Sequence, residues 1–171
     1  MSIVQDPVAQ GVRSFESADF RRAMGQFASG VVVVTTETEG EVHGMTANAF
    51  MSGSLEPPLV IVSVACKARL HEKINASGVF GVSILAQEQR WASNHFAGKP
   101  SPDLQPQFVA LGGVHVLDGS KVAIATQVRH SYPCGDHTLF VGEVTDIRFP
   151  AEPADPLLYH CGQYGKFGHE N

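Results

Sequence analysis

Short runs of β-branched and apolar residues, separated by turn residues, are the dominant pattern of this chain. Residues 31–36 are β-branched throughout and predict a buried strand. The polar residues 37–41 predict a hairpin loop, so residues 42–48 should return beside the first strand. After the Glu-Pro-Pro break at residues 56–58, the apolar residues 59–64 predict a strand that is buried on both faces.

The same pattern continues in the second half of the chain. The predicted strands of this half are residues 79–85, 114–117, 121–130, 137–149 and 156–160. Asp118-Gly119 is a hairpin signal and should join the strands on either side of it. A turn at residues 132–136 should lead into the next strand. Residues 99–111 hold three prolines and little periodicity, and they predict a loop.

Three stretches have helical periodicity instead. Residues 17–29 place Phe20, Met24 and Phe27 on one face, and Gly30 should end this helix. A shorter helix should follow the third strand and run to about residue 76. A third amphipathic helix is predicted over residues 87–97.

The two later helices each have an apolar side that should face the core. In the shorter one, Leu70 and Ile74 should point inward, and Gly78 should close the helix. The third helix should bury one face, made of Trp91, Ala92, His95 and Phe96. Six or seven strands with three helices do not fit a doubly wound sheet. They predict a mainly β fold, a closed or split antiparallel β-barrel with peripheral helices.

Composition and charge narrow the class of protein. At 171 residues the chain is long enough for one domain with its own core, expected at residues 15–168 after a flexible arm at residues 1–14. The net charge of −5 and the lack of a Lys/Arg cluster exclude a nucleic-acid groove. The three cysteines form no paired framework and favour a reducing cytoplasm. No apolar run has the length of a membrane span, and the first residues lack a signal pattern.

Residues 44–64 are the main candidate for a ligand-binding site in this sequence. Their first half is small and polar, which leaves main-chain N–H and C=O groups open to a neighbour. The hydroxyls of Thr46, Ser52 and Ser54 suit a polyol or a phosphate. The alternative to a ligand site, equally supported by the sequence, is a strand and turn of small residues that pack against other main chain.

Two further polar groups suit a ligand. Lys67, Arg69 and His71 stand just before a helix, where cations and free N–H groups suit an anion, and a solvated basic patch is the alternative. His137 follows a tight turn beside Asp136, which can orient the imidazole. A simple contact within the turn is the alternative there.

Other catalytic patterns find little support. Cys134 and His137 have C-x-x-H spacing, and His160 adjoins Cys161, but no second pair completes a four-ligand metal site. No G-x-S-x-G, P-loop or G-x-G-x-x-G motif is present, which disfavours a serine hydrolase and a Rossmann dehydrogenase. No function is assigned to His43.

Several motifs, in order, resemble the short-chain NAD(P)H:flavin oxidoreductases, which have a flavin-reductase-like, FMN-binding split barrel. The resemblance covers about residues 20–164. The motifs that carry it are FRRAMGQFASGV at residues 20–31, GMTANAF at 44–50, SLEPPLV at 54–60, FAG at 96–98, GDH at 135–137 and GQY at 162–164.

The resemblance implies a homodimeric reductase that uses NADH or NADPH to reduce FMN, or FAD, and supplies the reduced flavin to a separate monooxygenase. It implies His137 near the nicotinamide as the catalytic residue. The implied flavin contacts are Thr46, Ala47, Asn48, Ala49 and Phe50 at the ring edge, Ser52 and Ser54 along the ribityl tail, Ala65, Cys66, Lys67, Arg69 and His71 at the phosphate, and also Phe96 and Tyr164.

This chain departs from the resembled pattern at two positions. Many relatives have Ser or Thr in place of Leu70 and Asn in place of Ser83, which leaves Lys67 and Arg69 as the expected phosphate partners. Two other functions remain open from the sequence. One is an FMN-binding electron carrier without NAD(P)H turnover, and the other is an oxidase of the pyridoxamine-phosphate-oxidase type.

Overall fold

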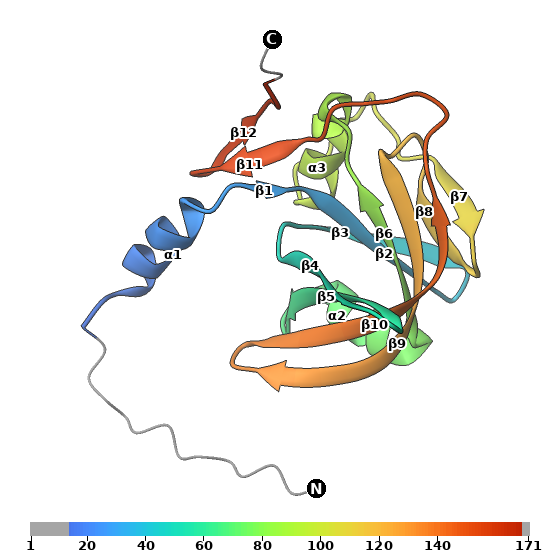
Figure 1. The fold of residues 1–171 in the computed structure, drawn as a ribbon, viewed down its shortest axis with the longest axis horizontal. Helices are drawn as coiled ribbons and strands as arrows, with labels where there is room; N and C mark the ends of the chain where they lie inside the picture. Colours follow the sequence, from blue (N-terminus) through green and yellow to red (C-terminus); the bar gives the residue numbers. More distant parts are fainter. Residues whose placement is uncertain (1–13, 169–171) are drawn as a thin grey trace, which may run out of the picture.

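The structure, a computed structural model, describes residues 14–168. One seven-stranded antiparallel sheet, in the order β3-β2-β6-β9-β10-β5-β4, curls around a core (Figure 1). Its strands are β2 (Val32–Thr38), β3 (Glu41–Ala47), β4 (Phe50–Leu55), β5 (Pro58–Ala65), β6 (Val79–Ile84), β9 (Val122–Cys134) and β10 (His137–Arg148). The mainly β fold is confirmed. The arm predicted at residues 1–14 lies outside the described residues except for Ser14.

The two edge strands of this sheet follow one another in the chain. β3 and β4 are joined by Asn48 and Ala49 alone, yet they lie at opposite ends of the strand order. The N–H of Ser63 donates to the carbonyl of Ala49 over 3.0 Å and ties this junction to β5. The sheet therefore stays open between its edges, as in a split barrel.

β2 is buried on both faces, as its β-branched pattern predicts. Val32 and Val34 belong to the hydrophobic cluster inside the barrel. Val31, just before the strand, and Val33 belong to a second cluster on the outside. We call these the inner and outer clusters. β2 thus separates two layers of core, one beneath α2 and one beneath α3.

Helix α2 (Arg69–Ser77) covers the inner cluster. Leu70 is 3% exposed and Ile74 is 0% exposed, and both pack against the strands. Gly78 adopts a left-handed conformation with φ of 68° and ends the helix. The predicted inward residues and the predicted end are therefore confirmed.

The outer cluster lies between the sheet and the C-terminal half of the chain. Over it pack a 3-10 turn (Gln87–Gln89), α3 (Arg90–Phe96) and a small sheet of β1 (Ser29–Gly30), β11 (Leu158–His160) and β12 (Gln163–Gly165). Ala92 is fully buried there, and Trp91 is half-buried against the same cluster. The predicted helix at residues 87–97 is confirmed, but its first turn is a 3-10 helix and not an α-helix.

Three sequence expectations for the strands were wrong. β7 (Phe108–Leu111) forms where a loop was predicted, and it pairs with β8 (Val114–Leu117) through a Gly112-Gly113 turn. Asp118-Gly119 therefore does not join paired strands, because β8 already has β7 as its partner. β5 is fully buried on one face only, at Val60, Val62 and Val64, because the side chains of its other face are only half-buried within the described chain.

The predicted turn at residues 132–136 is shorter than expected. Cys134 and His137 are already paired, so only Gly135 and Asp136 form the turn between β9 and β10. Gly135 has a φ of 62°, a left-handed conformation that favours glycine in a two-residue hairpin turn. The long β9–β10 hairpin extends beyond the body of the barrel (Figure 1).

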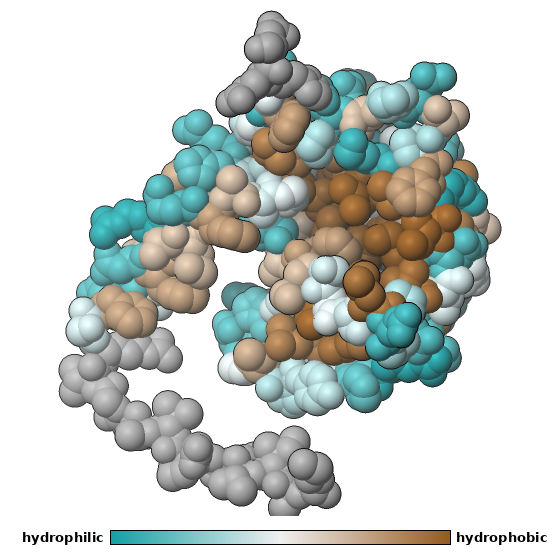
Figure 2. Space-filling model, in the orientation of Figure 1, coloured by the Kyte–Doolittle hydropathy of each residue, from teal (hydrophilic) through white to brown (hydrophobic). Residues whose placement is uncertain are grey.

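Helix α1 (Ser17–Gly25) ends four residues earlier than predicted and buries no side chain. Glu16, and not Ser17, caps its start through a reciprocal arrangement with Asp19. Phe20 is 55% exposed and Met24 is 56% exposed, because the helix stands apart from the barrel (Figures 1 and 2). The apolar face was predicted correctly, but nothing in residues 14–168 covers it. None of the helices in this range has the length and apolar character of a membrane span.

Candidate functional site

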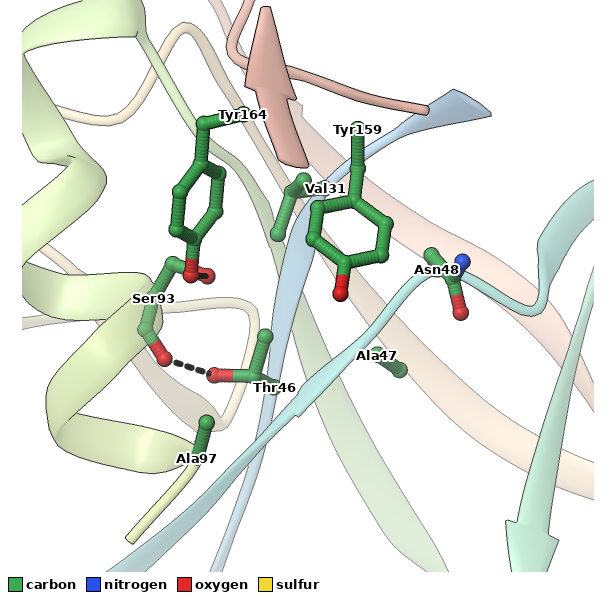
Figure 3. A pocket seen from close by; sticks show the side chains of 8 residues that line it. All are labelled: Val31, Thr46, Ala47, Asn48, Ser93, Ala97, Tyr159 and Tyr164. Atoms are coloured by element: carbon green, nitrogen blue, oxygen red, sulfur yellow. Dashed lines mark hydrogen bonds between the residues drawn. The ribbon is translucent and has the colours of Figure 1, made fainter. Parts of the chain in front are cut away.

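A hollow of about 200 Å³ lies where β3 ends (Figure 3). Three of its walls are the end of β3, helix α3 and the small C-terminal sheet. Its lining residues are Val31, Thr46, Ala47, Asn48, Ser93, Ala97, Tyr159 and Tyr164. The structure thus brings four of the expected flavin contacts, Thr46 to Asn48 and Tyr164, around one space.

Hydrogen bonds fix the walls of this hollow. The Thr46 hydroxyl donates to the Ser93 carbonyl over 2.7 Å. The Tyr164 hydroxyl donates to Asn94 Oδ1 at 3.0 Å and lies 2.8 Å from Ser93 Oγ. The guanidinium carbon of Arg90 lies over the Tyr164 ring, 4.8 Å from its centre. Since the Thr46 proton is used within the fold, Thr46 can offer a ligand only its oxygen lone pairs.

The bend after β3 offers main-chain donors. Asn48 and Ala49 are exposed, and no carbonyl in residues 14–168 accepts a hydrogen bond from either N–H. Phe50, by contrast, is half-buried and packs its ring against the inner cluster. A bulge separates Ser52 from Ser54 on the open edge of β4.

The predicted phosphate segment lies beside the predicted catalytic turn. Ala65 pairs with His137 across β5 and β10, and the Cys66 N–H donates to the Asp136 carbonyl at 2.9 Å. In the first turn of α2, His71 Nε2 lies 2.8 Å from the Thr138 hydroxyl. Segments about 70 positions apart in the sequence therefore lie together at one end of the paired strands β5 and β10.

Asp136 holds the ring of His137. The His137 Nδ1–H donates to Asp136 Oδ1 over 2.7 Å. This hydrogen bond, and then the charge of the imidazolium, hold the pKa of the Asp136 carboxyl below its ordinary value, with Lys67 adding a weaker pull in the same direction. Because Nδ1 is engaged, Nε2 is the ring atom left for a ligand.

His137 opens onto a second hollow, of about 580 Å³, between the β9–β10 turn and α1. Figure 2 shows the surface deeply recessed between this helix and the body of the barrel. The residues that line it are Phe15, Ser17, Phe20, Arg21, Gly135, Asp136 and His137. A planar group that lies over the turn can enter from this side.

Two expected contacts lie elsewhere. Arg69 and Phe96 line a third hollow, near the start of β3. Leu70 is buried in the inner cluster, and Ser83 Oγ accepts the Leu117 N–H at 2.9 Å, so both departures from the resembled pattern serve the fold.

Sequence reasoning missed part of the site. It assigned nothing to Ser93, Asn94 and Tyr159, which form the wall opposite β3. The one available signal was Ser93, a polar residue that interrupts the apolar side of α3. No group of three or more His, Cys, Asp or Glu side chains within residues 14–168 is arranged to hold a metal ion.

The family model, a relative from Rhodococcus sp and a solved structure that match this chain are all flavin reductases by name. The family model "Flavin reductase like domain" matches residues 24–168. An "NADH-dependent flavin reductase" of Rhodococcus sp is 46% identical over 147 residues, which are 84% of this chain and 82% of that protein. The "4-hydroxyphenylacetate 3-monooxygenase, reductase component" of Thermus thermophilus is 40% identical over 140 residues, 82% of this chain and 89% of that protein. The solved structure "Flavin reductase PheA2 in native state" superposes with a TM-score of 0.87 at 48% identity, covering 91% of this chain and all of that one.

Proposed function

Because the chain belongs to the flavin reductase like domain family, we propose that it is an NADH-dependent flavin reductase that supplies reduced flavin to a separate monooxygenase. The observation that carries the proposal is the exposed bend at Asn48 and Ala49, with two main-chain N–H groups free at the open edge of the barrel. Such donors fit the polar edge of an isoalloxazine ring. We treat residues 15–168 as the single reductase domain.

The bound flavin and NADH supply the redox chemistry, a hydride transfer from the nicotinamide to the flavin ring. The protein has to hold two planar groups in contact and to stabilise negative charge on the reduced ring. The N–H groups of Asn48 and Ala49 serve the second task, because they are fixed in place by the ends of β3 and β4. A fixed donor needs no reorganisation as charge develops.

Lys67 and Arg69 serve as partners of the flavin phosphate. Both are exposed, and both stand at the start of α2, where the helix dipole also favours an anion. The loop is held in place by the Cys66 hydrogen bond to Asp136. Ser52 and Ser54 on β4 offer hydroxyls to the ribityl chain.

His137 serves as the residue that positions and contacts the nicotinamide. Its Nδ1 is held by Asp136, so the ring has a fixed orientation and presents Nε2 to the hollow beside α1. It needs no change of protonation state for this role. His71 is held by Thr138 and supports the phosphate segment.

We infer further that the protein acts as a C2 homodimer in the cytoplasm. α1 exposes an apolar face, and further exposed apolar side chains are Met51, Leu55, Ile147 and Phe149. A helix of nine residues is marginal alone in water, so α1 needs a surface to pack on. A second copy supplies one by symmetry. The three cysteines are all unpaired, which suits a reducing compartment.

The test is oxidation of NADH by the purified protein in the presence of FMN, FAD or riboflavin, compared side by side. Turnover that rises with added free flavin is the expected result. An isolated yellow protein that does not oxidise NADH would instead support a flavin-binding electron carrier. Oxygen-dependent oxidation of an amine without NADH would support the oxidase alternative.

A further inference from the structure

The hollow at the end of β3 has to act on a ligand through hydrogen bonds, because none of the described residues that line it is charged. Four of these lining residues carry a hydroxyl group, namely Thr46, Ser93, Tyr159 and Tyr164. A hydroxyl has one proton to donate, so each of the four can serve either the fold or a ligand as a donor, and not both.

Three of the four hydroxyl protons are used within the fold. Thr46 donates to the Ser93 carbonyl, and Tyr164 donates to Asn94 Oδ1 over 3.0 Å. Because the Tyr164 proton points to Asn94, the Ser93 hydroxyl is the donor in its 2.8 Å contact with the Tyr164 oxygen. These three groups hold α3 to β3 and to the small C-terminal sheet, and they have no proton left for a ligand.

The hydroxyl of Tyr159 has no such partner. None of the described groups accepts its proton, and its ring meets the Tyr164 ring edge to face, with 5.5 Å between the ring centres. Figure 3 shows this hydroxyl pointing into the hollow, toward the end of β3. A half-buried tyrosine usually has a hydrogen-bond partner for its O–H, so we expect the missing acceptor on a ligand.

Tyr159 is held in place by main chain on both sides. It is the middle residue of β11, where it pairs with Ser29 of β1 and with Tyr164 of β12. Its ring also packs against the outer cluster. The phenol therefore needs little reorganisation to donate to a group in the hollow.

Tyr159 lies across the same hollow from the bend after β3. Ala47 and Asn48 line one side of the hollow, and Tyr159 lines another. In the function proposed above, the polar edge of the flavin ring lies at this bend and gains negative charge as the ring is reduced. A hydrogen bond to a charged acceptor is roughly twice as strong as one to a neutral acceptor. A donor at this place therefore favours the reduced ring over the oxidised ring.

We propose that the Tyr159 hydroxyl is a further catalytic group, which donates to the flavin ring and binds the reduced ring more strongly than the oxidised ring. The inference rests on the proposed function for the position of the ring. It gives two neighbouring tyrosines different roles. Tyr159 raises the reduction potential of the bound flavin, whereas Tyr164 holds the wall of the hollow.

The test is the variant Tyr159→Phe, which removes one oxygen atom and keeps the ring. Dissociation constants of oxidised FMN, and of FMN reduced beforehand with dithionite, are measured without NADH and without oxygen. The variant should weaken oxidised FMN about two- to tenfold and reduced FMN about ten- to a hundredfold. If the two losses differ about tenfold, the midpoint potential of the bound flavin falls by about 30 mV. The melting temperature should stay near that of the wild type, because this hydroxyl bonds no described group of the fold.

Tyr164→Phe is the matched control, since it removes the same atom from the other ring of the pair. This variant loses two hydrogen bonds of the fold and should lower the melting temperature. Any loss of affinity should be equal for oxidised and reduced FMN, so the midpoint potential of the bound flavin should not change.

The inference would be overturned if Tyr159→Phe weakened oxidised and reduced FMN equally, or weakened neither. A higher KM for NADH with both FMN constants unchanged would assign the hydroxyl to the nicotinamide, and would also overturn it. A wild-type protein whose flavin potential depends on Tyr159 but that does not oxidise NADH would leave Tyr159 assigned and the proposed function wrong. A wild-type protein that binds no FMN would exclude both.

Discussion

The contact between Asp136 and His137 joins two neighbouring residues of the proposed site at 2.7 Å, although the Asp136 side chain is 93% exposed. The two residues are neighbours at the mouth of a hairpin, and the main chain of Asp136 also accepts from Cys66. The imidazole is therefore oriented by a residue whose main chain is tied to the sheet. The proposed contact of His137 with the nicotinamide can therefore be tested separately from any contribution of His137 to folding.

His137→Ala should slow flavin reduction by NADH or raise the KM for NADH about five- to thirtyfold, equivalent to about 1–2 kcal/mol. The cause is a loss of productive stacking of the nicotinamide. Flavin affinity should stay near that of the wild type, because the expected flavin contacts lie on other elements. Stopped-flow reduction beside a thermal melt makes the comparison. A destabilised variant with unchanged hydride transfer would show that His137 only holds the turn.

The lowered pKa of Asp136 predicts a dependence of stability on pH. A carboxyl with a depressed folded-state pKa stabilises the fold above its unfolded-state pKa, about 3.9, and this stabilisation is lost as the pH falls through the folded-state value. The difference in stability between the wild type and Asp136→Asn should thus be present at about pH 5 and close below about pH 4. Urea unfolding of both proteins across this range measures it. A difference that grows on acidification would contradict the pairing with His137.

Arg69→Ala should weaken FMN at least about tenfold, since a charge-assisted contact to phosphate contributes about 1.5–3 kcal/mol. Riboflavin has no phosphate and should bind as before. Fluorescence titration with both flavins gives the two constants. If both fall equally, Arg69 acts on the fold of α2 and not on the phosphate.

At the residue scale, the sequence predicted which types of residue form the proposed site better than it predicted which of them lie together in space. Small residues at Thr46 to Ala49 and a histidine beside an aspartate can be read directly from the chain. That Arg69 lines a hollow together with Lys73 and His95 could not be read, because it depends on how α2 packs against α3 and β3.

At the scale of elements, the strands were predictable where β-branched residues line both faces, as in β2. The errors have physical causes. β7 is four residues long and follows a proline-rich segment, so its pattern is too short to detect. α1 ends at Gly25, although apolar residues continue at helical spacing to Phe27, because Ser29 and Gly30 are drawn into pairing with β11. The periodicity of a local sequence cannot show that pairing with a distant strand will end a helix early.

Gly44 joins β3 to α3 and gives a prediction for these elements. In Gly44→Ala the new Cβ would lie 2.6 Å from the Phe96 ring, so the ring must move. Overpacking of this kind should lower the free energy of unfolding by about 1–3 kcal/mol. Denaturant unfolding measures it. The matched control is Gly30→Ala, whose Cβ would meet nothing within 4 Å and whose effect should be below about 1 kcal/mol. Equal effects of the two substitutions would mean that Phe96 yields without cost.

At the scale of the whole molecule, α1 and the open side of the barrel expose apolar side chains that the proposed dimer would cover. Light scattering at micromolar concentration should give about twice the chain mass of 18.3 kDa. The double variant Phe20→Ser, Met24→Ser should shift this equilibrium toward the monomer, because it removes apolar contact area from α1. Arg22→Ala, on the polar side of the same helix, is the control. A monomer at micromolar concentration in the wild type would exclude the dimer.

Trp91 has a practical consequence for work on this protein. It is the only tryptophan of the chain, and it packs against the same cluster as Tyr159 and Tyr164, which line the hollow at the end of β3. Ultraviolet emission of the indole therefore originates close to one wall of the proposed flavin site. A flavin absorbs in the range where indole emits, so resonance energy transfer should dim this emission as the site fills. Loading and release of flavin can thus be followed in real time without attaching a dye.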